Sequence, residues 1–183
     1  MIVDPRYKPF RWWWIEDALS SEMLGWLLRQ DADPIALDSR RAATNDERTW
    51  ITSGPVARYF DSEETRSNFG ELTGCDFSQG KTRIELCSDY ADEIQLDTHI
   101  DIKEKLMTYQ IYLEGDAWSG TDLYEEQDGQ PITRVPFYKN CGWLVVDKRE
   151  SWHGLERRPL TKPRKSLIVN YVIGDWSDTE QLV

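Results

Sequence analysis

The chain has 183 residues, of which 39% are hydrophobic and 30% are charged, and nine are Trp. This composition excludes a disordered chain and favours one domain over residues 1–183 with a single core. The 22 basic and 33 acidic residues give a net charge of −11, so most of the surface would repel a polyanion such as nucleic acid.

The three cysteines, Cys75, Cys87 and Cys141, lack the spacing of a zinc site or a disulfide framework. The segment 1–14 carries charged side chains and lacks the apolar run of a signal peptide, and no stretch reaches the length of a membrane span. We therefore expect a cytoplasmic protein without a membrane partner. Its oligomeric state does not follow from the sequence.

The first part of the chain, residues 1–80, is expected to be helical. The signals are side chains that can cap a helix, a proline suited to a first turn and a glycine suited to a helix end. They are Ser20 before a helix that ends near 31–34, Pro55, the pair Asp61 and Glu64, and Gly74. The run Trp12-Trp13-Trp14 is compatible with two roles, an aromatic wall over a substrate or an anchor of the N-terminus to the core.

From residue 81 onward, short runs rich in Val, Ile, Thr and Tyr alternate with Gly, Asp, Asn and Pro. They predict strands near 82–88, 94–100, 105–113, 120–126, 131–136, 142–147 and 165–173. Asp128-Gly129 indicates a two-residue hairpin between the fourth and the fifth. The pattern predicts a mainly β (α+β) fold, an antiparallel sandwich or jelly roll over 81–176, with the early helices packed on one sheet.

The chain has two histidines, and their surroundings suggest a metal site. His99 and Asp101 are two residues apart in a predicted strand, where they would point to the same face. His153 lies 52 residues after Asp101 and can supply a third ligand from a separate strand. Two imidazoles and one carboxylate leave three octahedral positions open, as in non-haem iron(II) oxygenases. Each histidine taken alone is weak evidence, because a lone histidine is more often a core or surface residue than a metal ligand.

Arg164 lies eleven residues after His153 and opens the last long predicted strand, with Ser166 on the same face. A guanidinium group matches a carboxylate in bidentate fashion, and a serine hydroxyl can add a hydrogen bond. Burial of this cation on an apolar strand face would require an anionic partner. The alternative is an arginine at an exposed sheet edge beside Lys162 and Lys165.

Short motifs follow one another in a fixed order between Arg83 and Trp176. They are Tyr90, His99-Ile100-Asp101, Tyr112-Leu113-Glu114 with Trp118, Gly120 and Leu123, Gly142 to Val146, His153-Gly154 and Arg164-Lys165-Ser166. In this order and spacing, the segment resembles the prolyl-4-hydroxylase-like branch of the 2-oxoglutarate/iron(II)-dependent dioxygenase superfamily. The resemblance covers about half of the chain.

The resemblance implies a double-stranded β-helix, a cupin-like jelly roll, with iron(II) between its sheets. It also implies that 2-oxoglutarate and O2 are consumed, with release of succinate and CO2, while a C–H bond of the substrate is oxidised. The implied iron ligands are His99, Asp101 and His153, and Arg164 is the implied partner of the distal carboxylate of 2-oxoglutarate. Further hydrogen-bonding residues for this co-substrate are implied at Ser166, Tyr112 and Tyr90, although each tyrosine also suits an ordinary strand.

The chain departs from the pattern of this family at several positions. Glu114 stands where the family often has Asn, and Ser119-Gly120 replaces two glycines, which puts a protein-prolyl substrate in doubt. Asn170 stands where the nucleic-acid demethylases of the superfamily usually have an arginine, which argues against nucleic acid repair. Asp101 argues against the related halogenases, in which a small residue replaces the carboxylate.

We therefore expect an oxygenase that hydroxylates or otherwise oxidises a small-molecule or amino-acid-like substrate. Segment 31–54, rich in Arg, Asp and Thr, is compatible with a loop that closes over the pocket and with a disordered segment. Two alternatives remain: a cupin-like protein that binds a metal or ligand, or acts as a sensor, without catalysis, and a metalloenzyme that uses the same three ligands without 2-oxoglutarate. The identity of the substrate does not follow from the sequence.

Overall fold

The computed structural model describes residues 2–32, 48–89, 93–146 and 149–174. Its helices are α1 (Ser21–Leu27), α3 (Gly54–Asp61) and α4 (Glu63–Thr73). Its strands are β1 (Ile2–Arg6), β2 (Trp12–Glu16), β3 (Thr49–Trp50), β4 (Lys81–Asp89), β5 (Glu93–His99), β6 (Lys105–Glu114), β7 (Asp122–Leu123), β8 (Thr133–Arg134), β9 (Gly142–Val145), β10 (His153–Pro159) and β11 (Arg164–Val172).

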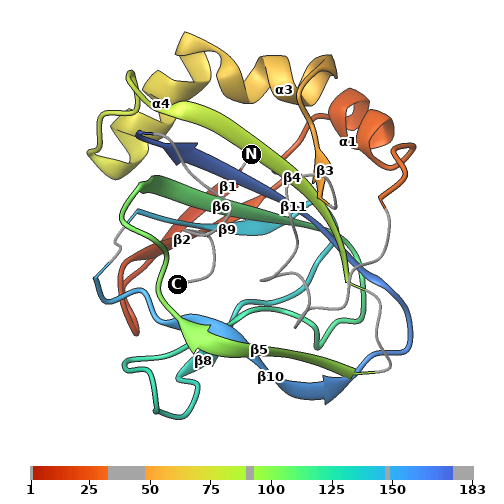
Figure 1. The fold of residues 1–183 in the computed structure, drawn as a ribbon, viewed down its shortest axis with the longest axis vertical. Coiled ribbons are helices and arrows are strands. Elements are labelled where there is room, and N and C mark those ends of the chain that lie inside the picture. The colour runs from red at the N-terminus through yellow and green to blue at the C-terminus, as the bar shows by residue number, and fades with distance from the viewer. Residues whose placement is uncertain (1, 33–47, 90–92, 147–148, 175–183) are drawn as a thin grey trace.

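The strands form two antiparallel sheets. The larger sheet has seven strands in the order β1-β2-β9-β6-β11-β4-β3, and the smaller has four in the order β5-β10-β7-β8. Figure 1 shows the larger sheet between the helices on one side and the smaller sheet on the other. The predicted mainly β fold, with early helices packed on one sheet, is confirmed.

The two faces of the larger sheet differ because side chains alternate along each strand. On β6, Tyr109 points toward the helices, where its ring contacts those of Phe60 and Phe69 within the main hydrophobic core. The neighbouring positions, Thr108 and Gln110, line a cavity that faces the smaller sheet. One face of this sheet therefore stabilises the fold while the other carries polar side chains.

The N-terminal part is less helical than predicted. β1, β2 and β3 all belong to the larger sheet, and β2 pairs with β9 so that Trp13 lies opposite Leu144. Aromatic and β-branched side chains, as in the run from Trp12 to Ile15, pack well on a sheet. All three tryptophans are buried, as expected for an anchor of the N-terminus to the core.

The helix signals were mostly correct. The Ser20 side chain accepts a hydrogen bond from the Met23 amide at 3.2 Å, and Pro55 lies in the first turn of α3. The left-handed backbone of Gly74, with φ of 79°, ends α4. The predicted cap at Asp61 is wrong, because the Ser62 side chain caps α4 instead.

The second half contains one strand that was not predicted and one connection that was predicted too short. β10 was missed because its sequence, with Gly154 and two arginines before Pro159, lacks a β-type alternation. β7 and β8 pair as expected for the fourth and fifth strands, but segment 124–132 connects them, so the two-residue hairpin at Asp128-Gly129 is wrong. A hydrogen bond from the Ile132 amide to the Leu123 carbonyl closes this longer loop.

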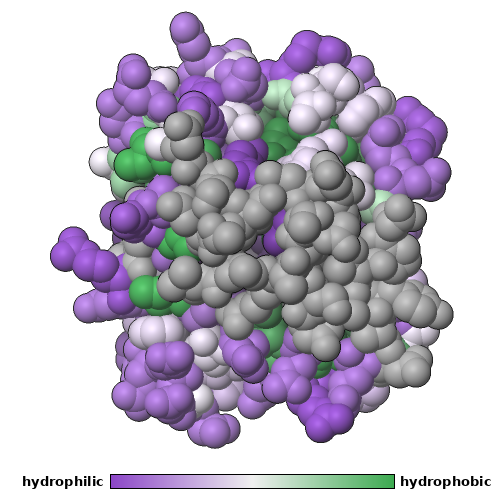
Figure 2. Space-filling model, in the orientation of Figure 1, coloured by the Kyte–Doolittle hydropathy of each residue, from purple (hydrophilic) through white to green (hydrophobic). Residues whose placement is uncertain are grey.

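Hydrophilic side chains dominate the described part of the molecular face in Figure 2, in line with the high content of charged residues. None of the helices in the described ranges has the length and apolar character needed to cross a membrane.

Candidate active site

A cavity of about 120 Å³ lies between the two sheets. Side chains from both sheets line it, and many of them are polar. They are Cys87, Asp89, Leu96, His99, Asp101, Lys105, Thr108, Gln110, Thr121, Trp143, His153, Leu155, Arg164, Ser166 and Ile168. Four residues predicted to serve the metal and the co-substrate carboxylate, distant in the chain, therefore meet in one place.

Pairing of β5 with β10 brings the two histidines together. His99 ends β5 and lies directly opposite His153, the first residue of β10. Opposite residues of antiparallel strands share one face of the sheet, and the two ring centroids are 4.4 Å apart. The Trp143 ring contacts His153 edge-on at 5.3 Å and supports it from the larger sheet.

Hydrogen bonds to the backbone set the tautomer of both imidazoles. The Nδ1 atom of His99 lies 2.8 Å from the Asp97 carbonyl oxygen, and that of His153 lies 2.8 Å from the Ser151 carbonyl oxygen. A carbonyl oxygen can only accept, so each Nδ1 carries the proton. In a neutral imidazole this proton on Nδ1 leaves the lone pair on Nε2, which is the arrangement of most metal-binding histidines.

The Asp101 side chain is only 8% exposed. One carboxylate oxygen forms an ion pair with the Lys105 ammonium group, and the other accepts a hydrogen bond from the Thr108 hydroxyl at 2.6 Å. Burial alone would raise the pKa of this carboxyl, but Lys105 and then His153 lower the pKa well below its usual value of 3.8. The carboxylate is therefore ionised at neutral pH, as a metal ligand must be.

The donor set fits an octahedral divalent metal, because it consists of two imidazoles with Nδ1 bonded to the backbone and one ionised carboxylate. In this structure one Asp101 oxygen contacts Lys105 and the other contacts Thr108. Within the described ranges, no group of three or more His, Cys, Asp or Glu side chains is arranged to hold a metal ion. Metal binding would require Asp101 to exchange one of these contacts. The role of these residues as iron ligands stays a prediction.

Arg164 is 3% exposed and not at an exposed sheet edge. Its Nη1 atom lies 2.8 Å from a carboxylate oxygen of Asp89, the residue opposite it on β4, and its Nε donates to the Ser119 carbonyl at 2.8 Å. The rings of Tyr112 and Phe137 flank the guanidinium carbon at 5.6 and 5.8 Å. The anionic partner that burial of this arginine requires is thus already present in the chain.

The other predicted co-substrate residues differ in position. Ser166 lines the cavity, and its hydroxyl accepts a hydrogen bond from the Gln110 amide at 3.1 Å. Tyr112 is fully buried and its hydroxyl donates to Thr121 at 2.9 Å, so it does not line the cavity but supports residues that do. Tyr90 lies outside the residues that the structure describes.

Gln110 is a site residue that the sequence analysis missed. Its amide oxygen accepts hydrogen bonds from the Thr121 hydroxyl at 2.9 Å and the Trp143 indole at 3.1 Å, while its amide nitrogen donates to Ser166. A signal was present, because Thr108, Gln110 and Tyr112 are polar residues at alternate positions of an otherwise apolar strand. Such alternation marks a polar stripe on one face.

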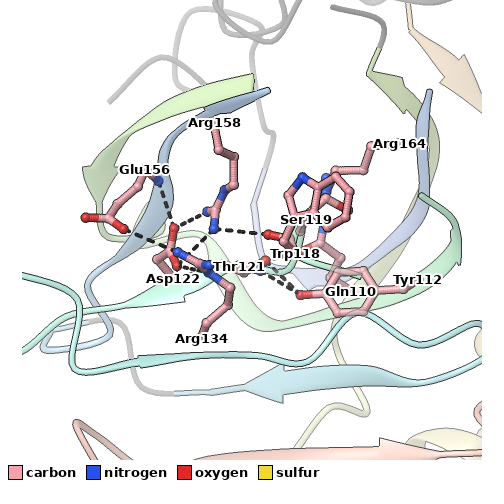
Figure 3. Close-up of polar contacts among 10 residues, drawn as sticks. All are labelled: Gln110, Tyr112, Trp118, Ser119, Thr121, Asp122, Arg134, Glu156, Arg158 and Arg164. Atoms are coloured by element: carbon pink, nitrogen blue, oxygen red, sulfur yellow. Dashed lines mark hydrogen bonds and ion pairs between the residues drawn. The ribbon is translucent and has the colours of Figure 1, made fainter. Parts of the chain in front are cut away.

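Asp122 connects the strands next to His153. Its carboxylate is fully buried, accepts hydrogen bonds from Arg134 Nε at 2.7 Å and the Glu156 amide at 2.8 Å, and forms an ion pair with Arg158 (Figure 3). Arg158 thus joins β10 to β7. Arg157, the preceding residue, is exposed and pairs with Glu93, as expected of a basic residue on a solvated face.

The fold is that of the 2-oxoglutarate/iron(II) oxygenases, as solved structures show. A 2OG-Fe(II) oxygenase family oxidoreductase from Burkholderia pseudomallei aligns with 90% of this chain and 85% of its own, with a TM-score of 0.61 and 12% identity. A prolyl-4-hydroxylase from Pseudomonas putida aligns with 88% and 85%, with a TM-score of 0.59 and 16% identity. A viral collagen prolyl hydroxylase from Paramecium bursaria Chlorella virus-1 aligns with 88% of both chains, with a TM-score of 0.53 and 13% identity.

The resemblance that the sequence motifs indicated is therefore confirmed at the level of the fold. No protein-family model matches the chain, and no curated protein matches it significantly. At identities of 12–16%, these structures support the shared fold but do not assign roles to individual residues of this chain.

Proposed function

We propose that the protein is an iron(II)- and 2-oxoglutarate-dependent oxygenase that hydroxylates or otherwise oxidises a C–H bond of a small-molecule or amino-acid-like substrate. The observation that supports the proposal is the meeting of two imidazoles, each with Nδ1 hydrogen-bonded to a backbone carbonyl, in a cavity that Asp101 and Arg164 also line. We further assign the two sheets to a double-stranded β-helix, the winding that the resemblance implies.

In this proposal His99, Asp101 and His153 hold iron(II) and Arg164 binds the distal carboxylate of 2-oxoglutarate. When bound, iron and 2-oxoglutarate supply the oxidising chemistry, in which O2 is consumed and succinate and CO2 are released. The backbone carbonyls of Asp97 and Ser151 keep both imidazoles oriented, since each accepts a hydrogen bond from Nδ1. The small cavity limits water around the reacting groups.

The acidic surface bears on the substrate. A net charge of −11 favours the approach of neutral or cationic molecules over polyanions. A screen of amino acids, nucleosides, sugars and lipid-like acids for substrate-stimulated succinate formation would identify the class. Stimulation by the lipid-like acids alone, with no response to neutral or cationic molecules, would contradict the inference from charge.

An anaerobic titration with iron(II) and then 2-oxoglutarate tests the proposed function. We expect a charge-transfer absorption band in the wild-type protein, no band in the His153→Ala variant, and an affinity for 2-oxoglutarate that falls about tenfold or more in Arg164→Gln. Arg157→Gln is the matched control, because this arginine is exposed on the outer surface.

The outcomes separate the proposal from its alternatives. A band with oxygen-dependent succinate release supports an enzyme. A band without succinate release, with every substrate class tested, would favour a non-catalytic binding or sensor protein. Metal binding without any response to 2-oxoglutarate would indicate a metalloenzyme of another kind, in which Arg164 only stabilises the fold.

A further inference from the structure

Arg164, the proposed anchor of the co-substrate, already has an internal carboxylate as its partner. Arg164 and Asp89 lie opposite each other on β11 and β4, their side chains are 3% and 4% exposed, and Nη1 is 2.8 Å from the nearer carboxylate oxygen. Both residues line the cavity between the sheets. Any anion that reaches Arg164 therefore also approaches the charge of Asp89.

Contacts on several sides hold the guanidinium group in place. Nε donates to the Ser119 carbonyl, Nη1 contacts Asp89, and two aromatic rings flank the guanidinium carbon. Nη2 forms no hydrogen bond with any residue of the described ranges. This nitrogen is thus the part of the guanidinium group that is left for a ligand in the cavity.

We propose that Asp89 is a positioning residue that determines how strongly this pocket selects a dianionic co-substrate; the inference rests on the proposed function. Two opposite charges in contact largely cancel at a ligand a few ångströms away. A carboxylate bound at Nη2 gains the attraction of Arg164 and loses much of it to repulsion from Asp89. The pocket therefore has a weaker preference for 2-oxoglutarate over a 2-oxo acid that lacks the distal carboxylate. An arginine without an acidic partner would give a stronger preference.

Replacing Asp89 separates this role from a purely structural one. Asp89→Asn keeps the shape and an oxygen acceptor for Arg164 but removes the charge. It leaves a buried cation uncompensated in the ligand-free protein, which lowers stability. A dianionic ligand then supplies the missing charge, so the same variant should bind 2-oxoglutarate more tightly. A residue that only stabilises the fold would lower stability and leave the selectivity for the distal carboxylate unchanged.

The test measures binding by calorimetry and by the melting temperature, under anaerobic conditions with manganese(II) as a redox-inert metal. The two ligands are 2-oxoglutarate and 2-oxopentanoate, which has the same carbon chain with a methyl group in place of the distal carboxylate. We expect Asp89→Asn to melt at a lower temperature without ligand, and to increase the affinity ratio of 2-oxoglutarate to 2-oxopentanoate about tenfold. Glu71→Gln, an exposed change of the same charge on α4, is the control and should leave the ratio unchanged.

Each outcome decides between the two proposals. A ratio that rises in Asp89→Asn and not in Glu71→Gln supports the role of Asp89. An unchanged or smaller ratio, with wild-type protein that binds 2-oxoglutarate, overturns that role and leaves the proposed function intact. Manganese binding without 2-oxoglutarate binding by either protein overturns both.

Discussion

Single polar side chains on the inner face of the larger sheet determine the character of the cavity. Gln110 is central among them, since its amide connects residues of β6, β9 and β11 with the segment that contains Thr121. Its partners Thr121, Trp143 and Ser166 are themselves buried, and the Trp143 indole and the Ser166 hydroxyl both have Gln110 as their hydrogen-bond partner. A polar network of this kind is stable only while every member is satisfied.

We expect Gln110→Leu to lower the free energy of unfolding by about 2–4 kcal/mol, because it leaves buried donors of Thr121 and Trp143 without their acceptor. Urea denaturation would measure the loss. The same change at the exposed Gln79 should alter stability by less than about 0.5 kcal/mol. Equal effects at both positions would show that the network contributes little.

At the scale of secondary structure, β10 positions the site. It pairs with β5 on one side and β7 on the other, so His153 lies opposite both His99 and Leu123. Gly154, the next residue, allows this close approach: a Cβ atom there would lie 2.7 Å from the Leu96 carbonyl oxygen. The distance between the two histidines therefore depends on a position without a side chain.

Gly154→Ala should separate β10 from β5, lower the free energy of unfolding by about 1–3 kcal/mol and weaken metal binding. Calorimetry with manganese(II), together with urea denaturation, would measure both effects. Gly25→Ala is the matched control: the new Cβ has room within α1, where alanine stabilises a helix by up to about 1 kcal/mol. Unchanged metal affinity in Gly154→Ala would show that β10 tolerates displacement.

For the molecule as a whole, the free energy of unfolding depends on pH through acidic side chains whose pKa values are lowered in the folded protein. A hydrogen bond from Thr82 lowers the pKa of Asp61 below its usual value of 3.8, burial opposes this, and Arg66 lowers it further. For Asp116, burial would raise the pKa, but hydrogen bonds from Thr161 lower it overall. A carboxyl whose pKa is lower in the folded state stabilises the protein above pH 4 and ceases to do so as the pH falls through the folded pKa.

We therefore expect the stability difference between wild type and Asp61→Asn to be largest near pH 7 and to shrink steadily as the pH falls below about 4. Urea midpoints measured across this range would test the expectation. Asp128→Asn provides the comparison, since the exposed Asp128 carboxylate forms no hydrogen bond or ion pair with described residues. A difference for Asp61→Asn that did not change between pH 7 and acidic pH would contradict the assigned cause.

Much of this arrangement was specified by residues close together in the chain. Short runs rich in Val, Ile, Thr and Tyr predicted β4, β6 and β11 to within a few residues. One helix begins after the cap at Ser20 and another ends at the left-handed Gly74, both as expected, although the first ends at Leu27, before the predicted end near 31–34. The motif order identified the fold that solved structures share, along with five residues that line the cavity. These features depend on local backbone preference and side-chain chemistry, which a linear sequence contains.

Other features depended on neighbours far away in the chain. β10 is a strand because β5 and β7 supply its hydrogen bonds, and Gln110 is a central site residue because three distant partners converge on it. The partner of Arg164 lies 75 residues earlier and became visible only once β4 and β11 were aligned. The pairing of distant strands determines which charged side chains lie next to each other, and the register of that pairing cannot be predicted from local sequence patterns.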